Sequence, residues 1–247
     1  MAYQHTFKRY ELKYMLSADQ ADRLRQLMRT YMAVDRYGWT VIRNLYYDTE
    51  NYRLIRHSME KPVYKEKLRV RSYRQVSPEE PVFVELKKKY QGVVYKRRVA
   101  LPEKQAMQWL SGHPEQTPDG QIGREIAYVC DFYRSLHPAV FLSYERQAWY
   151  ELQGSDLRVT FDRNILFRQE ALSLREPVWG TPLLPEDRVL MEVKTSGAMP
   201  LWLTGFLAEE KLPRASFSKY AAAYSNYIFP KWKGWNGYDE KSVSGNL

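Results

Sequence analysis

Basic residues recur at every second position in one short segment of this sequence, and this spacing suggests the chemistry of the protein. Side chains two apart in a β-strand share a face. Residues 64–73 therefore put Leu68 and Val70 on one face of a strand and four cations on the other: Lys65, Lys67, Arg69 and Arg71. Arginine can bind a phosphate through two parallel hydrogen bonds, and lysine acts as a point charge. A surface of this kind is suited to phosphate groups.

The same alternation of apolar and ionic residues occurs in other segments. Their ionic positions are Arg9, Glu11 and Lys13; Glu85, Lys87 and Lys89; Lys96 and Arg98; Arg158, Thr160 and Asp162; and Glu192 and Lys194. One interpretation is an antiparallel sheet with its charged face in water. However, a solvated face normally mixes charges of both signs, whereas these faces are strongly positive. We therefore expect the ionic faces to line a tunnel and the apolar faces to lie under helices.

Eight strands are expected to position these residues, at about 7–16, 39–48, 63–75, 81–89, 93–101, 138–151, 156–168 and 188–195. Helices are expected at about 17–32, 49–58, 103–111, 121–136, 199–210 and 217–228, with Ser17 and Asp48 as caps of the first two. The fold class is therefore predicted to be α+β, an eight-stranded antiparallel β-barrel with helices packed outside. We expect one domain over residues 1–229, followed by a loosely ordered tail, 230–247.

Composition narrows the class of partner. The chain has 247 residues and a net charge of +9, an excess that favours an anionic partner such as nucleic acid, a membrane surface or phosphate. A single cysteine, Cys130, allows no intrachain disulfide and is expected to be a buried core thiol. No segment has the pattern of a signal peptide or a membrane span. We therefore expect a cytoplasmic protein, and a membrane partner stays open.

A carboxylate among cations is the candidate metal ligand. Glu192 is either a salt-bridge partner or a ligand for Mg²⁺ or Mn²⁺, ions that often need only one or two carboxylates when phosphates and water fill the other positions. Phosphoryl transfer needs mainly positioning and charge neutralisation. Other chemistries have less support, because the histidines are scattered and the sequence contains no Walker A, GxGxxG or GxSxG motif.

The strand sequences resemble a known family when taken together and in order. The segments are "KRYELKY", "KLRVRSY", "VFVELKKK", "VVYKRRVAL", "YERQAWY", "LRVTFDRN", "VLMEVKT" and "ASFSKY". Their order is similar to that in the catalytic domain of the vacuolar transporter chaperone (VTC) family, a member of the triphosphate tunnel metalloenzymes, which include the CYTH-type triphosphatases. The resemblance covers about residues 6–228.

This resemblance implies a tunnel that makes polyphosphate from ATP with Mn²⁺ or Mg²⁺. Glu192 would hold the metal, and Ser218 would add a hydroxyl or backbone N–H contact. Arg69, Arg71, Lys87 and Arg158 would hold the triphosphate of ATP and, with Glu192, form the catalytic set. The remaining phosphate-binding residues implied are Lys13, Lys96, Arg98, Arg146, Lys194 and Lys219.

One departure from the family pattern favours synthesis over hydrolysis. CYTH-type triphosphatases carry ExExK in the first strand, whereas this chain has Arg9, Glu11 and Lys13 at those positions. The chain also lacks the regulatory domain and the membrane segment of fungal members, so we expect a stand-alone form. Two alternatives stay open: a triphosphatase that uses the same residues with water, and a module that binds polyphosphate or nucleic acid without catalysis. No nucleic-acid partner is expected, since the aromatic residues fall mostly on apolar faces.

Overall fold

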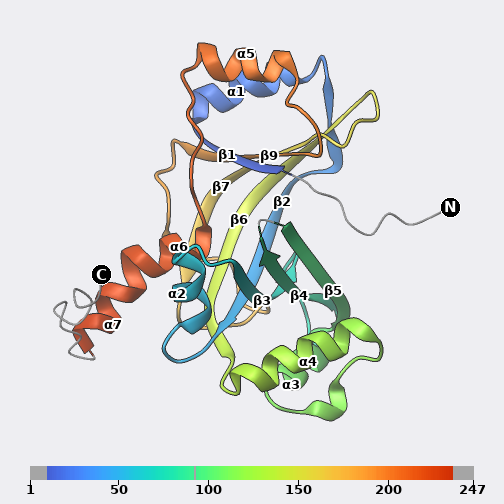
Figure 1. The fold of residues 1–247 in the computed structure, drawn as a ribbon, viewed down its shortest axis with the longest axis vertical. Coiled ribbons are helices and arrows are strands. Elements are labelled where there is room, and N and C mark those ends of the chain that lie inside the picture. The colour runs from blue at the N-terminus through green and yellow to red at the C-terminus, as the bar shows by residue number, and fades with distance from the viewer. Residues whose placement is uncertain (1–9, 92, 236–247) are drawn as a thin grey trace.

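The computed structural model describes residues 10–91 and 93–235, and its centre is one nine-stranded antiparallel sheet (Figure 1). The strand order is β1-β9-β7-β6-β2-β3-β4-β5, with β8 paired to β7. The strands are β1 (Tyr10–Ser17), β2 (Met32–Asp48), β3 (Tyr64–Ser72), β4 (Pro81–Tyr90), β5 (Val93–Pro102), β6 (His137–Glu151), β7 (Arg158–Arg168), β8 (Thr181–Pro182) and β9 (Arg188–Thr195).

The sheet is curled, but it is not a closed barrel. All eight expected strands are present, and the two-residue β8 was not expected. Within the described ranges, β1 and β5 end the sheet and do not pair with each other. The curl brings the two ends close, because Lys87 Nζ of β4 lies 3.8 Å from Glu11 Oε2 of β1. The predicted closure is therefore wrong. One reason is that the outer edge of β1 is already occupied: the Ala215 N–H donates to the Lys13 carbonyl at 2.7 Å.

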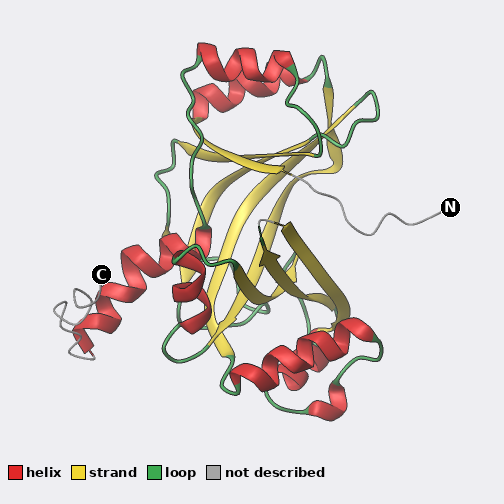
Figure 2. Cartoon of the chain, in the orientation of Figure 1, coloured by secondary structure: helices red, strands yellow, loops and turns green. Residues whose placement is uncertain are grey.

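Helices lie at both ends and along one side of the curled sheet (Figure 2). They are α1 (Ala18–Met28), α2 (Arg53–Met59), α3 (Glu103–Leu110), α4 (Gln121–Tyr133), α5 (Leu201–Glu209), α6 (Lys219–Ala223) and α7 (Phe229–Trp235). Helices α1 and α5 pack against β1, β7 and β9, and α3 and α4 pack against β3 and β4. A third apolar cluster joins α6 to β2, β6 and β7. The first two clusters lie on the outward faces of their strands. The third packs α6 against the same strand faces that carry Arg146 and Glu192, so α6 covers part of the concave side and the ionic residues line the rest of it.

Two side chains predicted as helix caps bind groups of the first turn. Ser17 and Gln20 make a capping box: Ser17 Oγ accepts from the Gln20 N–H at 3.1 Å, and Gln20 Oε1 accepts from the Ser17 N–H at 2.9 Å. The buried Asp48 carboxylate accepts from the N–H groups of Leu54 and Ile55 at 2.8 and 3.0 Å, in the first turn of α2. The Ser17 prediction is confirmed. Asp48 is not the N-cap residue, because α2 begins at Arg53 after Tyr52, but its carboxylate still binds N–H groups of the first turn.

Several predicted boundaries differ from the structure. Strand β2 begins at Met32 rather than 39, and its register with β6 is irregular between Val34 and Trp39, where Gly38 has a φ of 58°. After α6, a π-helical turn, Tyr224–Ile228, continues into α7. The predicted loosely ordered tail is therefore wrong for residues 230–235, which belong to α7. Pro230 is the second residue of this helix, a position where proline is tolerated. The predicted tail beyond Trp235, and Arg9, lie outside the described residues.

A transmembrane helix is not found in the described part of the chain, because none of its helices is both long and apolar enough.

Candidate phosphate-binding site

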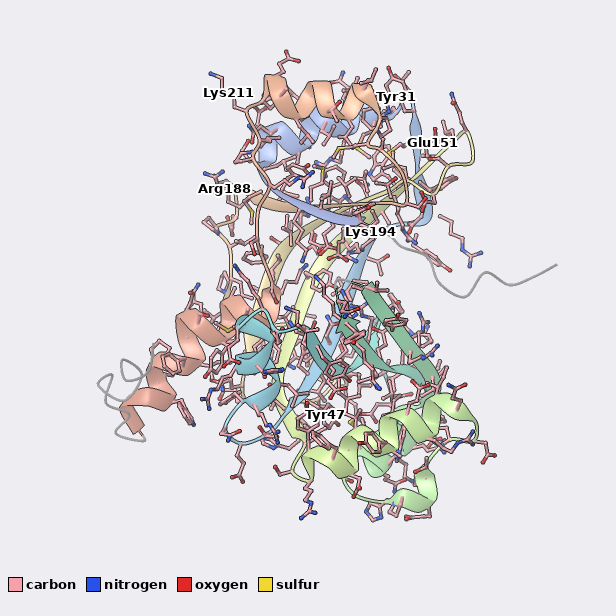
Figure 3. All side chains as sticks on the ribbon, in the orientation of Figure 1. Tyr31, Tyr47, Glu151, Arg188, Lys194 and Lys211 are labelled. Atoms are coloured by element: carbon pink, nitrogen blue, oxygen red, sulfur yellow. The ribbon has the colours of Figure 1, made fainter. Side chains whose placement is uncertain are left out.

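The concave side of the sheet carries cations from several strands and from the start of α6. Alternation along each strand sends these side chains to the same side, because the intervening residues pack under the helices. The positions brought together are Lys13 on β1; Lys67, Arg69 and Arg71 on β3; Lys87 on β4; Lys96 on β5; Arg146 on β6; Lys194 on β9; and Lys219 on α6. Lys194, labelled in Figure 3, lies beneath β1 and β9 on the side that faces β3–β5. The fold therefore assembles most of the residues singled out from the sequence.

Glu85 organises the arginines of β3. Its side chain is 1% exposed, and Arg69 Nε donates to Glu85 Oε2 at 2.9 Å while Lys96 Nζ lies 2.8 Å from Glu85 Oε1. Burial alone would raise the pKa of Glu85, but Arg69, Arg71 and Lys96 lower it to about 2. The Glu85 carboxylate is therefore charged at neutral pH, and it holds the side chains of Arg69 and Lys96 over the concave face.

Tyrosines and an asparagine complete the arginine contacts. Arg69 Nη1 donates to the Tyr46 hydroxyl at 2.9 Å. Arg71 Nε donates to Asn44 Oδ1 at 2.9 Å, and Arg71 Nη2 donates to the Tyr144 hydroxyl at 3.2 Å. Burial would raise the pKa of Tyr46, yet the neighbouring cations, Arg69 first, lower it to about 8. These neutral partners orient the guanidinium groups without cancelling their charge.

Asp162 and Glu192 form a second acidic centre on β7 and β9. Arg146 donates to both oxygens of Asp162 at 2.6 Å, and Lys219 Nζ donates to Asp162 Oδ2 at 2.5 Å. Glu192 lies within 4 Å of four cations: Lys194 at 3.1 Å, Arg146 at 3.2 Å, Lys13 at 3.6 Å and Lys219 at 3.8 Å. Burial opposes ionisation, but Lys219, Arg146, Lys194 and Lys13 together hold the pKa of Glu192 well below its usual value.

Some predicted site residues lie at the margin of this network. The Arg158 side chain is 58% exposed, and its nearest carboxylate is Asp35 at 3.8 Å. Arg98 is exposed and stacks on the Phe83 ring at 3.5 Å from the ring centre. Ser218 caps α6, and its hydroxyl accepts from Lys67 Nζ at 3.3 Å. Arg158 and Arg98 are therefore exposed at the margin of the network, whereas Ser218 is half-buried beside Lys67.

Several polar residues of the concave wall were not assigned to the site from the sequence. The inner faces were expected to be overwhelmingly positive, but carboxylates are interleaved with the cations. Four residues were recognised from the sequence as ionic positions but were given no role in the site: Glu11, Glu85, Lys67 and Asp162. The uncharged partners Asn44, Tyr46 and Tyr144 were not considered. The same alternation that selected the cations also marks Glu11, Glu85, Lys67 and Asp162, so the signal was present. What the pattern could not supply was the pairing across strands.

Glu11 and Glu192 are the carboxylates that fit a divalent ion. Glu11 is 32% exposed, and both carboxylates approach Lys13 Nζ, at 3.5 Å for Glu11 and 3.6 Å for Glu192. In the described ranges, no three acidic, histidine or cysteine side chains converge on one point as a cage. Mg²⁺ and Mn²⁺ sites beside phosphates commonly use only one or two carboxylates. The residues present therefore fit an ion whose other ligands are phosphate oxygens and water.

The curled sheet with its helices has the triphosphate tunnel (CYTH-like) fold, which two solved structures share. A Bacillus halodurans protein provisionally assigned as an adenylate cyclase has the same fold, with a TM-score of 0.54 and 14% identity over 87% of this chain and 96% of its own. A Hippeastrum protein, also provisionally assigned as an adenylyl cyclase and with a dominant triphosphatase activity, gives a TM-score of 0.53 and 18% identity over 87% of this chain and 95% of its own.

Within that class, the family is shown by the sequence. The family model for the VTC domain matches residues 8–228, so this chain belongs to the VTC domain family. The resemblance found in the strand motifs is thereby confirmed over nearly the same range. A search of curated proteins gives no significant match.

Proposed function

We propose that this protein is an ATP-dependent polyphosphate polymerase that transfers the γ-phosphate of ATP to a growing polyphosphate chain. The observation that carries the proposal is the excess of cations on the concave wall. The cations Lys13, Lys67, Arg69, Arg71, Lys87, Lys96, Arg146, Lys194 and Lys219 outnumber the carboxylates Glu11, Glu85, Asp162 and Glu192. Like charges held this close repel each other in a partly dehydrated site, so a polyanion is the ligand that would balance them.

The residues have separate roles in the proposed reaction. Arg69, Arg71 and Lys87 bind the triphosphate from one wall, while Lys13, Arg146, Lys194 and Lys219 bind phosphates from the opposite wall. Lys96, Arg98 and Arg158 bind phosphates nearer the openings. Glu11 and Glu192 would hold Mn²⁺ or Mg²⁺, which supplies further neutralisation of the developing charge.

The chemistry needs no protein nucleophile. A terminal phosphate oxygen of the polyphosphate chain attacks the γ-phosphorus in line and forms a new P–O bond. The bond between the γ-phosphorus and the β–γ bridging oxygen breaks, and ADP leaves with the electron pair. The cations hold the two phosphates in line and stabilise the charge on the transferred group.

A triphosphatase is the second candidate. The Hippeastrum protein with this fold has a dominant triphosphatase activity, and the same cations could hold ATP or inorganic triphosphate for attack by water. A module that binds polyphosphate without turnover is a third outcome of the same experiment.

Product analysis separates these functions. The purified chain is incubated with γ-labelled ATP and Mn²⁺, and the products are run on a urea gel beside Arg69→Ala, Glu192→Gln and the surface control Lys104→Gln. We expect a ladder of polymer for the wild type and the control, and its loss in both site variants. Orthophosphate without a ladder would identify a triphosphatase. Binding of polyphosphate with neither product would mean a binding module.

Glu192→Gln distinguishes the role of this carboxylate in turnover from a role in binding. The amide keeps the shape of the side chain but removes the negative charge from among four cations. We expect turnover to fall by at least about 100-fold, while affinity for inorganic triphosphate, measured by calorimetry without metal, stays equal or increases. Full activity of this variant would contradict the role assigned to Glu192.

A further inference from the structure

Lys67 differs from Lys87 and Lys96, the lysines beside it on β4 and β5, because it has no acidic partner among the described residues. It lies in register with Lys87 of β4, which in turn lies in register with Lys96 of β5. Lys87 lies 3.8 Å from Glu11, and Lys96 lies 2.8 Å from Glu85. Among the described residues, no carboxylate comes within ion-pair distance of Lys67, whose ammonium is half-buried and hydrogen-bonds to Ser218 Oγ at 3.3 Å.

Ser218 is held so that its hydroxyl proton stays available. Its Oγ accepts from Lys67 Nζ and, at 3.4 Å, from the backbone N–H of Ala221. Since both contacts use the oxygen as acceptor, the O–H group can donate to a further acceptor. The backbone position is fixed from the other side, because Lys13 Nζ donates to the Phe217 carbonyl at 2.8 Å. Lys67 and Ser218 thus offer two donors side by side.

The surroundings of Lys67 disfavour an isolated ammonium. The titratable groups that face it are Tyr46 from β2, Lys87 from β4, Lys13 from β1 and Lys65 from its own strand. Burial first, and then the three lysines, outweigh Tyr46 and lower the pKa of Lys67 to about 8. A buried cation without a counter-ion is unfavourable, so an anion is the partner missing from this position.

We propose that Lys67 and Ser218 form a distinct subsite for one phosphate group of a linear oligophosphate, beside the Arg69–Glu85 pair. This inference rests on the proposed function, since it assumes that the concave wall binds oligophosphates. The ammonium donates to one phosphate oxygen and the Ser218 hydroxyl donates to another. Lys87 and Lys96 would have to share their carboxylates with a phosphate, whereas Lys67 gives up no acidic partner.

The subsite gives binding a specific pH dependence. A bound phosphate favours the charged form of Lys67 and so raises its pKa above the free value of about 8. The contribution of Lys67 to affinity is therefore complete below the pKa of the free protein. It is lost as the pH rises through the higher pKa of the bound state. Arginine at the same position stays charged throughout this range, so Lys67→Arg would remove this part of the pH dependence.

Calorimetry with inorganic triphosphate, without turnover, tests the subsite between about pH 7 and about pH 9. The proteins compared are the wild type, Lys67→Met, Lys67→Arg and the surface control Lys104→Gln. At the lower pH, we expect Lys67→Met to bind roughly 10- to 100-fold more weakly, the effect of one lost charged hydrogen bond. Lys67→Arg should match the wild type at the lower pH and lose less affinity at the higher pH. The ionisation of the ligand is common to all four proteins and cancels in the comparison.

Each result decides the matter. Wild-type affinity in Lys67→Met, or an unchanged pH dependence in Lys67→Arg, would overturn the subsite while leaving the proposed function intact if the wild type makes polymer. No triphosphate binding by the wild type would overturn both proposals. Thermal melting of each variant checks folding, and Lys67→Arg keeps the test valid if Lys67→Met does not fold.

Discussion

Buried carboxylates of the concave wall are stable only because several cations contact each of them. Asp162 is fully buried, and its two oxygens receive three hydrogen bonds, two from Arg146 and one from Lys219. Taking such charges out of water is costly, and removing one member of a buried pair leaves the other uncompensated. Asp162 therefore maintains the position of both cations, and through them the second acidic centre at Glu192.

Asp162→Asn should test this structural role. We expect the free energy of unfolding to fall by about 3–5 kcal/mol, as for other broken buried pairs, in urea denaturation at neutral pH. The matched control is Glu145→Gln, which breaks the more exposed pair with Arg163 at 2.8 Å and should cost no more than about 1 kcal/mol. Equal effects of the two changes would contradict the role of burial.

Acid should weaken the wild type through the same carboxylate. Burial opposes ionisation, but Arg146 and Lys219 lower the pKa of Asp162 in the folded chain. Its stabilising contribution is therefore present above the unfolded pKa of about 3.9 and is lost as the pH falls toward the folded pKa. Denaturation as a function of pH should show a smaller acid-induced loss in Asp162→Asn than in the wild type. The same loss in both would mean that other groups dominate.

At the scale of elements, the segment between α5 and α6 joins parts of the sheet that the strands alone leave apart. Arg214 forms a bridge with Tyr14, and the Ala215 N–H bonds to the Lys13 carbonyl, so the segment runs along the free edge of β1. A few residues later, Ser218 contacts β3 and Lys219 contacts β7 and β9. The pairing of this segment with β1 thus positions two contacts on opposite walls: Ser218 with Lys67, and Lys219 with Asp162.

Ala215→Pro should displace this segment, because proline has no N–H to donate to Lys13. We expect weaker binding of inorganic triphosphate, by roughly 10-fold, the effect of about 1.4 kcal/mol, measured by calorimetry. Ala215→Ser keeps the N–H and is the control. Wild-type affinity in the proline variant would show that the edge contact does not position Ser218 and Lys219.

At the scale of the whole molecule, the surplus of positive charge and the curl of the sheet act together. The net charge is +9, and part of that surplus is concentrated on one concave face where the ends of the sheet approach each other. A concave surface of one sign focuses the field on ligands of the opposite sign. The unliganded state contains repulsion that a polyanion relieves, so ligand binding and stability should be linked.

Polyphosphate should therefore raise the melting temperature of the wild type. A ligand at about 100 times its Kd stabilises the folded state by about 2.7 kcal/mol, which corresponds to a rise of roughly 5–10 °C for a chain of this size. Orthophosphate at matched ionic strength is the control and should have a much smaller effect. The shift should shrink as salt is added, since salt screens the charges, and no shift at low salt would contradict a polyanion site.

Alternation along the strands was enough to predict which side chains share a face with the cations. The two-residue period along 64–73 and 188–195 fixes the two faces, because successive side chains in a strand point to opposite sides. Caps such as Ser17 with Gln20 were also readable, since their partners lie within one helical turn. The strand motifs are also local in sequence, and taken in order they were sufficient to identify the family.

Which charges meet, and whether the sheet closes, could not be predicted from local patterns and follows from the folded arrangement of the strands. Asp162 contacts Lys219 across 57 positions of the chain, and Lys67 contacts Ser218 across 151, distances over which no local period carries information. The outer edge of β1 is likewise occupied by a segment from the far end of the domain. Strand periodicity sets the direction of a side chain, whereas the curl and register of the whole sheet select its partner.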